Sequence, residues 1–324
     1  MSARHTAVAV LIAAVWGVNF VIIHLGLEHF PPLLFSALRF TFVALPAVFL
    51  VGSPRVRWYW VVAVGGSLGV LSFGLLFVGI DQGMPAGLSS LVLQTQVIFT
   101  VAFAVPFLGE RPGRTQFAGA AIALAGLAVI AVDRAASAPL LPFALVIGAA
   151  AAWGVSNVCT RLAQPPDGLA LMVWASLVAP LPLLALSFAF DGPGQIADAL
   201  RGVDLGGIGA LAYIVGPSTL FGFAAWSGLL RRYPAAVVAP FTLLVPIFGI
   251  AAAAIVLGER PSVAELGGAV LIVAGLLYGL RRPSGVRDEL QQRAVGIAEV
   301  DARPGAPAAV AGDRPLLDVD TARA

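Results

Sequence analysis

The feature that most constrains this chain is a series of ten long apolar runs separated by short polar or turn-forming breaks. An α-helix needs about 20 apolar residues to cross a hydrocarbon layer about 30 Å thick, and each run is near that length. Backbone polar groups in hydrocarbon must be satisfied within the segment, which favours helices. We therefore predict an all-α membrane protein with ten transmembrane helices, at about residues 6–26, 32–52, 59–80, 85–108, 114–132, 139–160, 168–190, 205–230, 234–257 and 262–280.

The composition excludes an ordinary soluble domain. Only 11% of the residues are charged, and the mean hydropathy is +0.95. The first run is too long for a cleaved signal peptide and carries Trp16 and Asn19 in its interior, so we predict a retained span. From about residue 283 the chain is rich in charged residues, Pro and Ala, which predicts a disordered tail over 283–324.

The arginines predict the orientation of the spans, because positively charged loops stay on the cytoplasmic side. With the N-terminus inside, the opposite side receives only Arg134, Arg201 and Arg260 near its span ends. We therefore expect both termini, and the tail, in the cytoplasm. The arginines expected on the cytoplasmic side are Arg4, Arg55, Arg57, Arg111, Arg114, Arg161, Arg231, Arg232, Arg281, Arg282 and Arg287.

The sequence repeats itself at a long interval. The phrase LGERPGRTQFAGAAIALAGL at 108–127 returns 149 positions later as LGERPSVAELGGAVLIVAGL. A second pair, WGVNF at 16–20 and WGVSN at 153–157, is 137 positions apart. Five helices precede the second copy, and five is odd, so that copy enters the membrane from the opposite face, as in many secondary transporters. The two predicted domains are five-helix repeats at 6–132 and 139–280.

Each repeat has a Gly-Glu-Arg turn between its last two helices. Glu110 and Arg111 occupy the first turn, and Glu259 and Arg260 occupy the second. We interpret both turns as structural corners that cap a helix or form an ion pair, because exposed ion pairs are weak signals of function.

The order of the motifs resembles a known family. WGVNF, PPLLFSALRF, GMPAGLSSLVLQTQ, a GER turn, WGVSN and GERPS followed by GGAVLIVAGLL are similar to the EamA family of the drug/metabolite transporter superfamily, over about residues 6–280. Within it, WGVNF, GMPAGLSSLVLQTQ and RYPAAVVAPFTLLVP most resemble exporters of cysteine and O-acetylserine. The resemblance implies export of small amino-acid-like metabolites across the bacterial inner membrane, with no cofactor and no ATP hydrolysis.

Polar side chains inside the apolar runs are the candidate substrate-binding residues, because such groups are costly unless buried against protein or water. Trp16 and Asn19 share one face of the first span, and Trp153, Ser156 and Asn157 share one face of the sixth. These faces are repeat-related, so we expect them to oppose each other near the centre. Asn suits both ends of a zwitterion. The alternatives are helix-to-helix bonding by Asn and packing or interfacial anchoring by Trp.

Two glutamines and one arginine complete the candidate site. Gln94 and Gln96 are about 200° apart around a helix, so we expect one to line the pocket and the other to bond a neighbouring helix. Their repeat counterparts are Leu243 and Val245, which predicts an asymmetric site. Arg39 could bind a substrate carboxylate, or it could snorkel or bond carbonyls near the outer end of the second span.

The predicted function is export of a small amino-acid-like metabolite through the lipid bilayer. The alternatives are a broader multidrug or nucleobase exporter and a lipid flippase component. The sequence has no phosphate-binding loop, metal-ligand spacing or nucleophile elbow, so we predict no enzyme activity, metal or cofactor, and no nucleic-acid partner. No span carries an Asp or Glu at its centre, so proton antiport, exchange and downhill efflux all remain open. The sequence predicts no oligomeric state.

Overall fold

The computed structural model describes residues 1–109, 113–137, 140–233 and 235–279, and all regular structure in these ranges is helical. The first Gly-Glu-Arg turn and the 283–324 tail lie outside the described residues. The helices of the first part of the chain are α1 (Ala3–Leu27), α2 (Pro32–Val48), α3 (Trp58–Val64), η1 (Gly65–Ser72), α4 (Phe73–Asp81), α5 (Ala86–Val92), η2 (Leu93–Thr95), α6 (Gln96–Leu108) and α7 (Arg114–Ser137).

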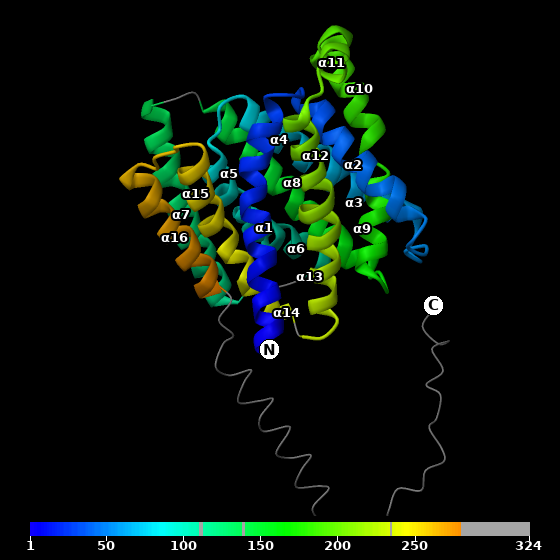
Figure 1. Cartoon of the computed structure of the whole chain (residues 1–324). Helices are drawn as coiled ribbons and strands as arrows, with labels where there is room; N and C mark the ends of the chain where they lie inside the picture. The colour runs from blue at the N-terminus through cyan, green and yellow to red at the C-terminus, as the bar shows by residue number, and fades with distance from the viewer. Residues whose placement is uncertain (110–112, 138–139, 234, 280–324) are drawn as a thin grey trace, which may run out of the picture. The chain divides into compact units, whose positions relative to one another are not determined.

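The second part of the chain is also helical, and Figure 1 shows both parts. Its helices are α8 (Leu141–Ala163), α9 (Gly168–Ser176), α10 (Pro180–Phe190), α11 (Gly192–Arg201), α12 (Leu205–Tyr213), η3 (Ile214–Phe221), α13 (Gly222–Leu230), α14 (Ala235–Val238), η4 (Ala239–Leu244), α15 (Val245–Val256) and α16 (Val263–Gly279).

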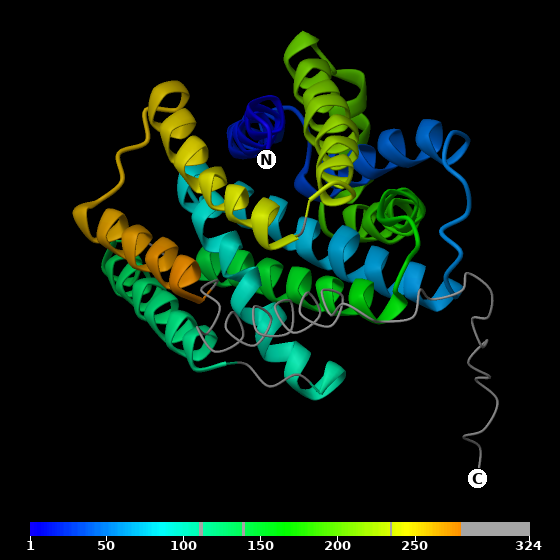
Figure 2. The ribbon, with the colours of Figure 1, turned by 90° about the horizontal axis from the view of Figure 1, so that it is seen from below.

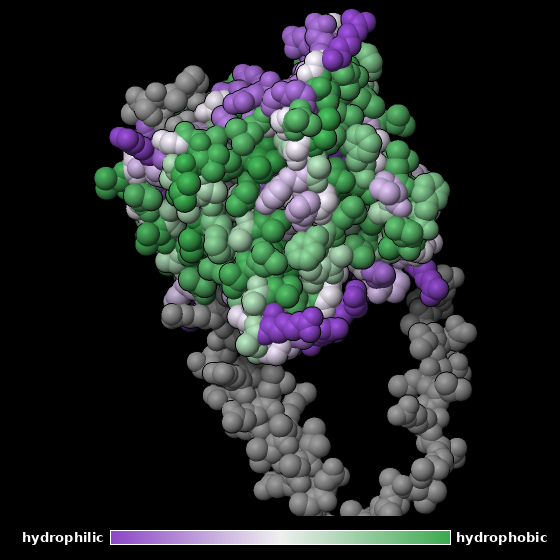
Figure 3. All heavy atoms as spheres, viewed as in Figure 1, coloured by the Kyte–Doolittle hydropathy of each residue, from purple (hydrophilic) through white to green (hydrophobic). Residues whose placement is uncertain are grey.

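The all-α membrane fold expected from the apolar runs is confirmed. Eight apolar helices or helix series in the described part are long enough to cross a membrane, and Pro32–Val48 and Val263–Gly279 are shorter apolar helices of 17 residues. Large apolar side chains face outward on many of them, such as Phe49, Trp58 and Leu205, each at least 75% exposed. Figure 3 shows the result as a broad apolar belt between polar ends. In a bilayer this belt faces lipid, which removes the cost of exposing it to water.

Several spans are interrupted where the sequence disfavours a regular α-helix. The run at 168–190 breaks at Leu177–Ala179, because Pro180 cannot continue the hydrogen bonding of α9. Pro217 does not end its span; the backbone widens into the π-helical segment η3 around it. The break predicted between the seventh and eighth runs contains a further helix, α11, which lies at the upper end in Figure 1.

The interruptions recur at one interval. The π-helical segments η1 and η3 begin at Gly65 and Ile214 and end at Ser72 and Phe221, each pair 149 residues apart. The 3₁₀ segment η2 follows α5, and η4 follows α14, and they end at Thr95 and Leu244, again 149 residues apart. The interval of 149 residues that separates the two copies of the repeated phrase therefore also separates equivalent interruptions of the α-helices.

Close helix packing links the two parts of the chain at matching glycines. A Cβ on Gly17 would lie 2.6 Å from Cβ of Phe248 on α15, and a Cβ on Gly154 would lie 2.8 Å from Cβ of Phe99 on α6. Small residues at such crossings let helices approach closely in a membrane, where packing replaces the hydrophobic effect as the main attraction. Phe99 and Phe248 are 149 residues apart, so each part of the chain packs against the other through equivalent positions.

Helices α7 and α16 form a separate pair at the edge of the described bundle. Figure 2 shows them side by side, away from α1. Gly119 approaches Gly275, and Gly126 approaches Gly268, with a built Cβ only 2.5 Å and 2.6 Å from the facing carbonyl oxygens. These four glycines let the backbones of α7 and α16 approach closely.

Candidate functional site

A cavity of about 110 Å³ lies between helices from both parts of the chain. Six of the eight predicted site residues line it: Trp16, Asn19, Arg39, Gln94, Gln96 and Trp153. The rest of its wall is mainly apolar, with Ser218 and Thr242 as the other polar residues. None of the described lining residues is an Asp or a Glu. The apolar residues of the wall are Phe20, Phe73, Leu76, Leu93, Phe223 and Val245.

The cavity lies within the membrane-spanning part of the bundle. Asn19 is eight residues before the end of α1, and Arg39 is seven residues after the start of α2. Gln94 is eight residues after the start of α5. At a rise of about 1.5 Å per residue, all three lie roughly 10–12 Å inside the same end of spans about 30 Å long. Thr242, seven residues after the start of α14, lines it from the opposite end.

Arg39 is buried at the cavity wall, with 2% of its side chain exposed. Its Nη2 donates to Oγ1 of Thr219 at 3.1 Å, and its Cζ lies 4.0 Å from the centre of the Phe73 ring. Its Nε and Nη1 have no hydrogen-bond partner in the protein. Arg39 therefore does not snorkel to the surface; it is a buried cation with two free donors, and a buried charge of this kind is costly without a counter-charge.

Asn19 presents an unused acceptor in the same wall. Its side chain is 6% exposed, and its Oδ1 has no hydrogen-bond partner. Buried polar atoms are nearly always satisfied, so such an atom beside a cavity needs an explanation. The cavity thus combines free donors on a cation with a free acceptor at about the same depth.

Both glutamines line the cavity, whereas the α-helical spacing led us to expect only one. The physical reason is the 3₁₀ segment η2, which rotates by about 120° per residue instead of about 100°. Side chains two residues apart then point only about 120° away from each other around the axis, rather than about 160° as in an α-helix. Each glutamine also bonds a neighbouring helix: Nε2 of Gln94 donates to the carbonyl of Thr242 at 2.6 Å, and Oε1 of Gln96 accepts from Nδ2 of Asn157 at 2.7 Å.

The two tryptophans of the repeated WGV phrases both line the cavity. Nε1 of Trp16 donates to the carbonyl of Ser218 at 2.9 Å, and its ring packs against Phe223 and Trp226 of α13. Trp153 packs against Phe73, with ring centres 5.6 Å apart. Phe73 therefore contacts both Trp153 and the guanidinium of Arg39.

Ser156 and Asn157 lie outside the residues that line the cavity. Ser156 is 3% exposed. Asn157 donates to Gln96 and, at 3.0 Å, to Oγ1 of Thr100 on α6. The reason is that α8 packs directly on α6 here, through Gly154 and Phe99. Asn157 thus takes the helix-bonding role that we kept as an alternative, and it reaches the cavity only through Gln96.

Contacts between the two parts of the chain lie at both ends of α1. At its N-terminal end, Nδ1 of His5 is 2.7 Å from the hydroxyl of Tyr233, and Arg232 is 2.9 Å from Nε2 of His5. A small apolar cluster of Ala9, Ile12, Leu229 and Val238 separates these contacts from Trp16. Trp16, which lines the cavity, packs against this cluster.

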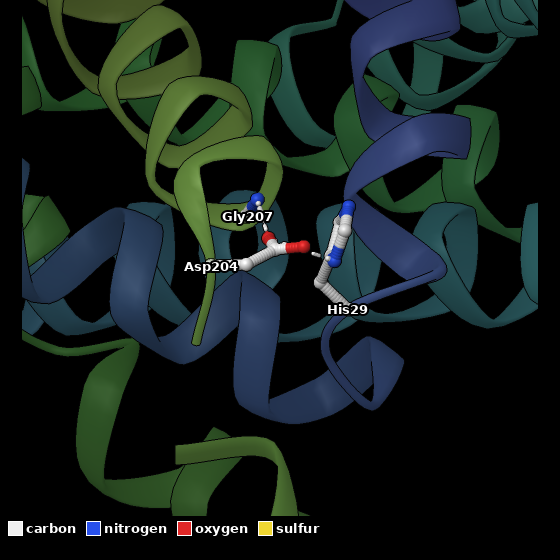
Figure 4. A network of polar contacts seen from close by, with 3 residues as sticks. All are labelled: His29, Asp204 and Gly207. Atoms are coloured by element: carbon white, nitrogen blue, oxygen red, sulfur yellow. Dashed lines mark hydrogen bonds and ion pairs between the residues drawn. The ribbon is translucent and has the colours of Figure 1, made fainter. Parts of the chain in front are cut away.

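At the other end, His29 meets the start of α12. Figure 4 shows the carboxylate of Asp204 between His29 and the backbone of Gly207. It accepts from the Gly207 N–H at 2.9 Å and lies 3.1 Å from Nδ1 of His29. The Gly207 hydrogen bond is the largest cause that lowers the pKa of Asp204 below its ordinary value of 3.8; desolvation opposes it, and the His29 charge and further backbone N–H groups lower the pKa by smaller amounts.

The second Gly-Glu-Arg turn caps a helix, as the structural interpretation of these turns anticipated. Glu259 accepts from the N–H groups of Ala86 at 2.7 Å and of Gly87 at 3.0 Å. These are the first residues of α5, whose own N-cap, Pro85, offers no side-chain acceptor. A residue of the second part of the chain thus holds the helix that leads to Gln94 in the first part.

A mainly apolar cavity with a few polar groups in its wall, apolar outer faces and short connections define a multi-pass membrane protein with a central small-molecule site, which is the construction of a transporter. Among the described residues, no group of three or more His, Cys, Asp or Glu could hold a metal ion. The chain belongs to the EamA-like transporter family, whose model matches it twice, over residues 5–132 and 140–280.

Relatives with similar names match most of the chain. It is 39% identical to the "Probable amino-acid metabolite efflux pump" of Salmonella typhimurium, over 87% of this chain and 97% of that protein. The Escherichia coli protein of the same name is 37% identical over the same shares. A "Probable terminal-alkyne amino-acid exporter" of Streptantibioticus cattleyicolor is 30% identical, over 86% and 94%. One crystal structure, 22% identical, shares the fold with a TM-score of 0.57 over 86% of this chain and 96% of that one.

Sequence reasoning missed the residues that position Arg39 and Trp16. Thr219 and Ser218 follow Gly216-Pro217, a pair that can break a helix, and the sequence pattern indicates no functional residue there. That break was the available signal, because non-α backbone at membrane depth is tolerated only against protein or a cavity. The apolar lining, such as Phe73, carried no signal, because its spans are apolar on every face.

Proposed function

We propose that this protein is a secondary transporter that exports small amino acids or their derivatives across the bacterial inner membrane by alternating access. The names of the relatives in Salmonella typhimurium, Escherichia coli and Streptantibioticus cattleyicolor support the substrate class. Cysteine and O-acetylserine are the first substrates to test. Family membership supports a transporter in place of an enzyme.

One observation carries this proposal: the cavity lies inside the membrane-spanning bundle and is lined from both parts of the chain. Trp16 and Trp153, which are repeat-related, both contribute to its wall. A site placed between two equivalent units can be exposed to either side when the units rock against each other. Its polar groups suit a small polar solute, because they would otherwise be costly at this depth.

The architecture we propose is ten transmembrane helices in two inverted five-helix repeats, 6–132 and 139–280. The recurrence of η1 as η3 at an interval of 149 residues supports it, as do the matching contacts of Gly17 and Gly154. The two 17-residue helices α2 and α16 are about 25 Å long, which is within the range that spans a bilayer.

The orientation we propose places both termini in the cytoplasm, as the arginine distribution predicts. Arg232 and the N-terminal end of α1 then lie on the cytoplasmic side, where His5 joins them. Asp204 and Glu259 lie on the outer side. In this arrangement the loops on the outer side of the inner membrane carry fewer arginines than the cytoplasmic loops, as the positive-inside rule predicts.

Export assays in intact cells test the proposal. Cells that overproduce the protein should release more cysteine or O-acetylserine into the medium than cells with an empty vector, and cells that lack it should retain more. The double variant Asn19→Ala, Gln94→Ala should reduce release at equal membrane abundance. Gln82→Ala is the matched control, because Gln82 is exposed after the end of α4. Unchanged release across a panel of amino acids would refute the substrate class.

The same assay separates this proposal from a multidrug exporter. A buried Arg39 without a described acidic neighbour in the wall repels organic cations, so overproduction should confer no resistance to bulky cationic compounds. Resistance without altered amino-acid release would favour the multidrug alternative.

A further inference from the structure

We propose that the cavity reads both charged ends of its substrate, with Arg39 binding the α-carboxylate and Asn19 accepting the α-ammonium. This inference rests on the proposed function and deepens it to a defined substrate class: amino acids in which both the carboxylate and the ammonium are free. Within this class, we expect substrates whose own side chains are small and uncharged. Neither the family nor the names of the relatives assigns these roles.

The carboxylate position follows from the free donors of Arg39. Nε and Nη1 are buried without partners, while Nη2 donates to Thr219. A guanidinium offers a carboxylate two forks, Nε with Nη2 and Nη1 with Nη2, and Nη2 carries two N–H bonds, so the bond to Thr219 leaves one fork with both of its donors free. Two donors in a fixed fork match the two oxygens of a carboxylate. A bound carboxylate would also supply the counter-charge that the described wall lacks, so its binding is favoured over that of a neutral group.

The orientation of Arg39 is fixed before a ligand arrives. Thr219 holds one end of the guanidinium, and the Phe73 ring lies against its face at 4.0 Å. Thr219 is in turn held by its bond to the carbonyl of Ile214 at 2.7 Å, inside the π-helical segment η3. A preorganised fork loses little conformational entropy on binding, which increases its affinity for a planar partner.

The ammonium position follows from Asn19. Its free Oδ1 is an acceptor, and it lies at about the same depth as Arg39, on the neighbouring helix α1. Trp16 is one turn away on the same face and also lines the cavity, so its ring can add a cation–π attraction. An ammonium donates three hydrogen bonds and accepts none, so it can use the free Oδ1 of Asn19 as an acceptor.

The two roles exclude specific analogues. A carboxyl ester has no negative charge for Arg39, and an N-acyl compound has no ammonium for Asn19. Each leaves a buried charge or acceptor unpaired, and sites built for hydrogen bonds reject such analogues more strongly than they reject a change of size. We expect each analogue to bind roughly tenfold to hundredfold more weakly than the parent amino acid.

Binding measurements on the purified full-length chain test the inference. The probes are O-acetyl-L-serine, its methyl ester and N,O-diacetyl-L-serine, and the variants are Arg39→Met and Asn19→Leu. Arg39→Met should bind the parent and the methyl ester equally but still reject the N-acyl probe. Asn19→Leu should bind the parent and the N-acyl probe equally but still reject the ester.

A purely structural role gives a different pattern. If each variant weakens all three probes by the same factor, or if the wild type binds the ester and the N-acyl probe as tightly as the parent, the inference is wrong. If Arg39→Met does not fold, Arg39→Lys keeps the charge but loses the fork, and it should reduce discrimination against the ester only. Export of amino acids by the wild type in cells, with none of this discrimination, would overturn the inference and leave the proposed function standing.

Discussion

At the residue scale, the most informative side chain is that of Arg39, whose guanidinium is held in place while its Nε and Nη1 have no hydrogen-bond partner. Arg39 has one protein partner, Thr219, and the Phe73 ring supports its face. Long charged side chains in a membrane usually reach an interface, yet this one is only 2% exposed. We propose that the unused donors bind an anionic group of the substrate, since no ion pair with a described residue occupies them.

Thr219→Val tests whether the orientation of Arg39 matters for binding. The change keeps the side-chain volume but removes the acceptor of Nη2, so the guanidinium loses its anchor. We expect the affinity for O-acetyl-L-serine to fall roughly three- to tenfold, the size of one hydrogen bond. Binding titrations on purified protein measure this, with Thr219→Ser as the control that keeps the hydroxyl. Equal affinity in the Val and wild-type proteins would contradict the positioning role.

Asp204 gives a prediction about pH at the same scale. Its pKa is lowered, so its charged form stabilises the folded protein above pH 3.8, and this contribution is lost as the pH falls through the lowered pKa. Asp204→Asn keeps the helix cap but loses the charge beside His29. We expect the wild type to have the higher Tm at pH 5, and the difference to shrink as the pH falls through the lowered pKa of Asp204. A difference that does not change as the pH falls would show that charge is not its source.

At the element scale, one carboxylate joins the two parts of the chain. Glu259 caps α5, which cannot cap itself because Pro85 precedes it. We expect Glu259→Ala to lower the free energy of unfolding by about 0.5–2 kcal/mol, the cost of a lost cap. Thermal unfolding in detergent measures the change. The matched control is Glu28→Gln, because Glu28 is exposed after the end of α1 and caps no other helix through its side chain in the described contacts.

The glycines at the helix crossings give a second prediction about elements. A Cβ on Gly17 would lie 2.6 Å from Cβ of Phe248, closer than real contacts allow, so α1 and α15 must separate. We expect Gly17→Ala to cost about 1–3 kcal/mol of stability and to reduce export. Gly66→Ala is the control, because nothing lies within 4 Å of its added Cβ and helix propensity alone favours Ala. If Gly17→Ala were as stable as the control, the close crossing would be wrong.

The elements also show how far sequence reasoning reaches. Span positions followed from hydropathy to within a few residues, because hydrocarbon thickness fixes the length of a helix. Asn19, Arg39 and Gln94 were found because a polar group within an apolar run must face protein or a cavity. The direction in which each side chain points around its helix was harder to predict from the sequence. The 3₁₀ segment η2 places both Gln94 and Gln96 in the wall of one cavity. Close packing at Gly154 places Asn157 within hydrogen-bond distance of Gln96.

At the scale of the whole bundle, a nearly symmetric frame surrounds an asymmetric site. Backbone interruptions and glycine crossings recur at fixed intervals, as η1 and η3 illustrate. The free polar atoms do not recur: in the described part, those of Asn19 and Arg39 both come from the first two helices. In the mechanism we propose, symmetry serves the exchange between two states, and asymmetry lets the site distinguish one end of a substrate from the other.

The inverted arrangement makes a prediction about sidedness. Arg114 begins α7, and Arg260 precedes α16, so these exposed arginines mark the equivalent turns of the two proposed repeats. In a background with Cys159→Ala, we introduce Arg114→Cys or Arg260→Cys and treat intact cells with a membrane-impermeant maleimide. We expect the thiol at 260 to react from outside, and the thiol at 114 to react only after the inner membrane is permeabilised. Because an odd number of crossings separates the two turns, labelling of both from the same side is incompatible with inverted repeats, and the alternating-access proposal would lose its structural basis.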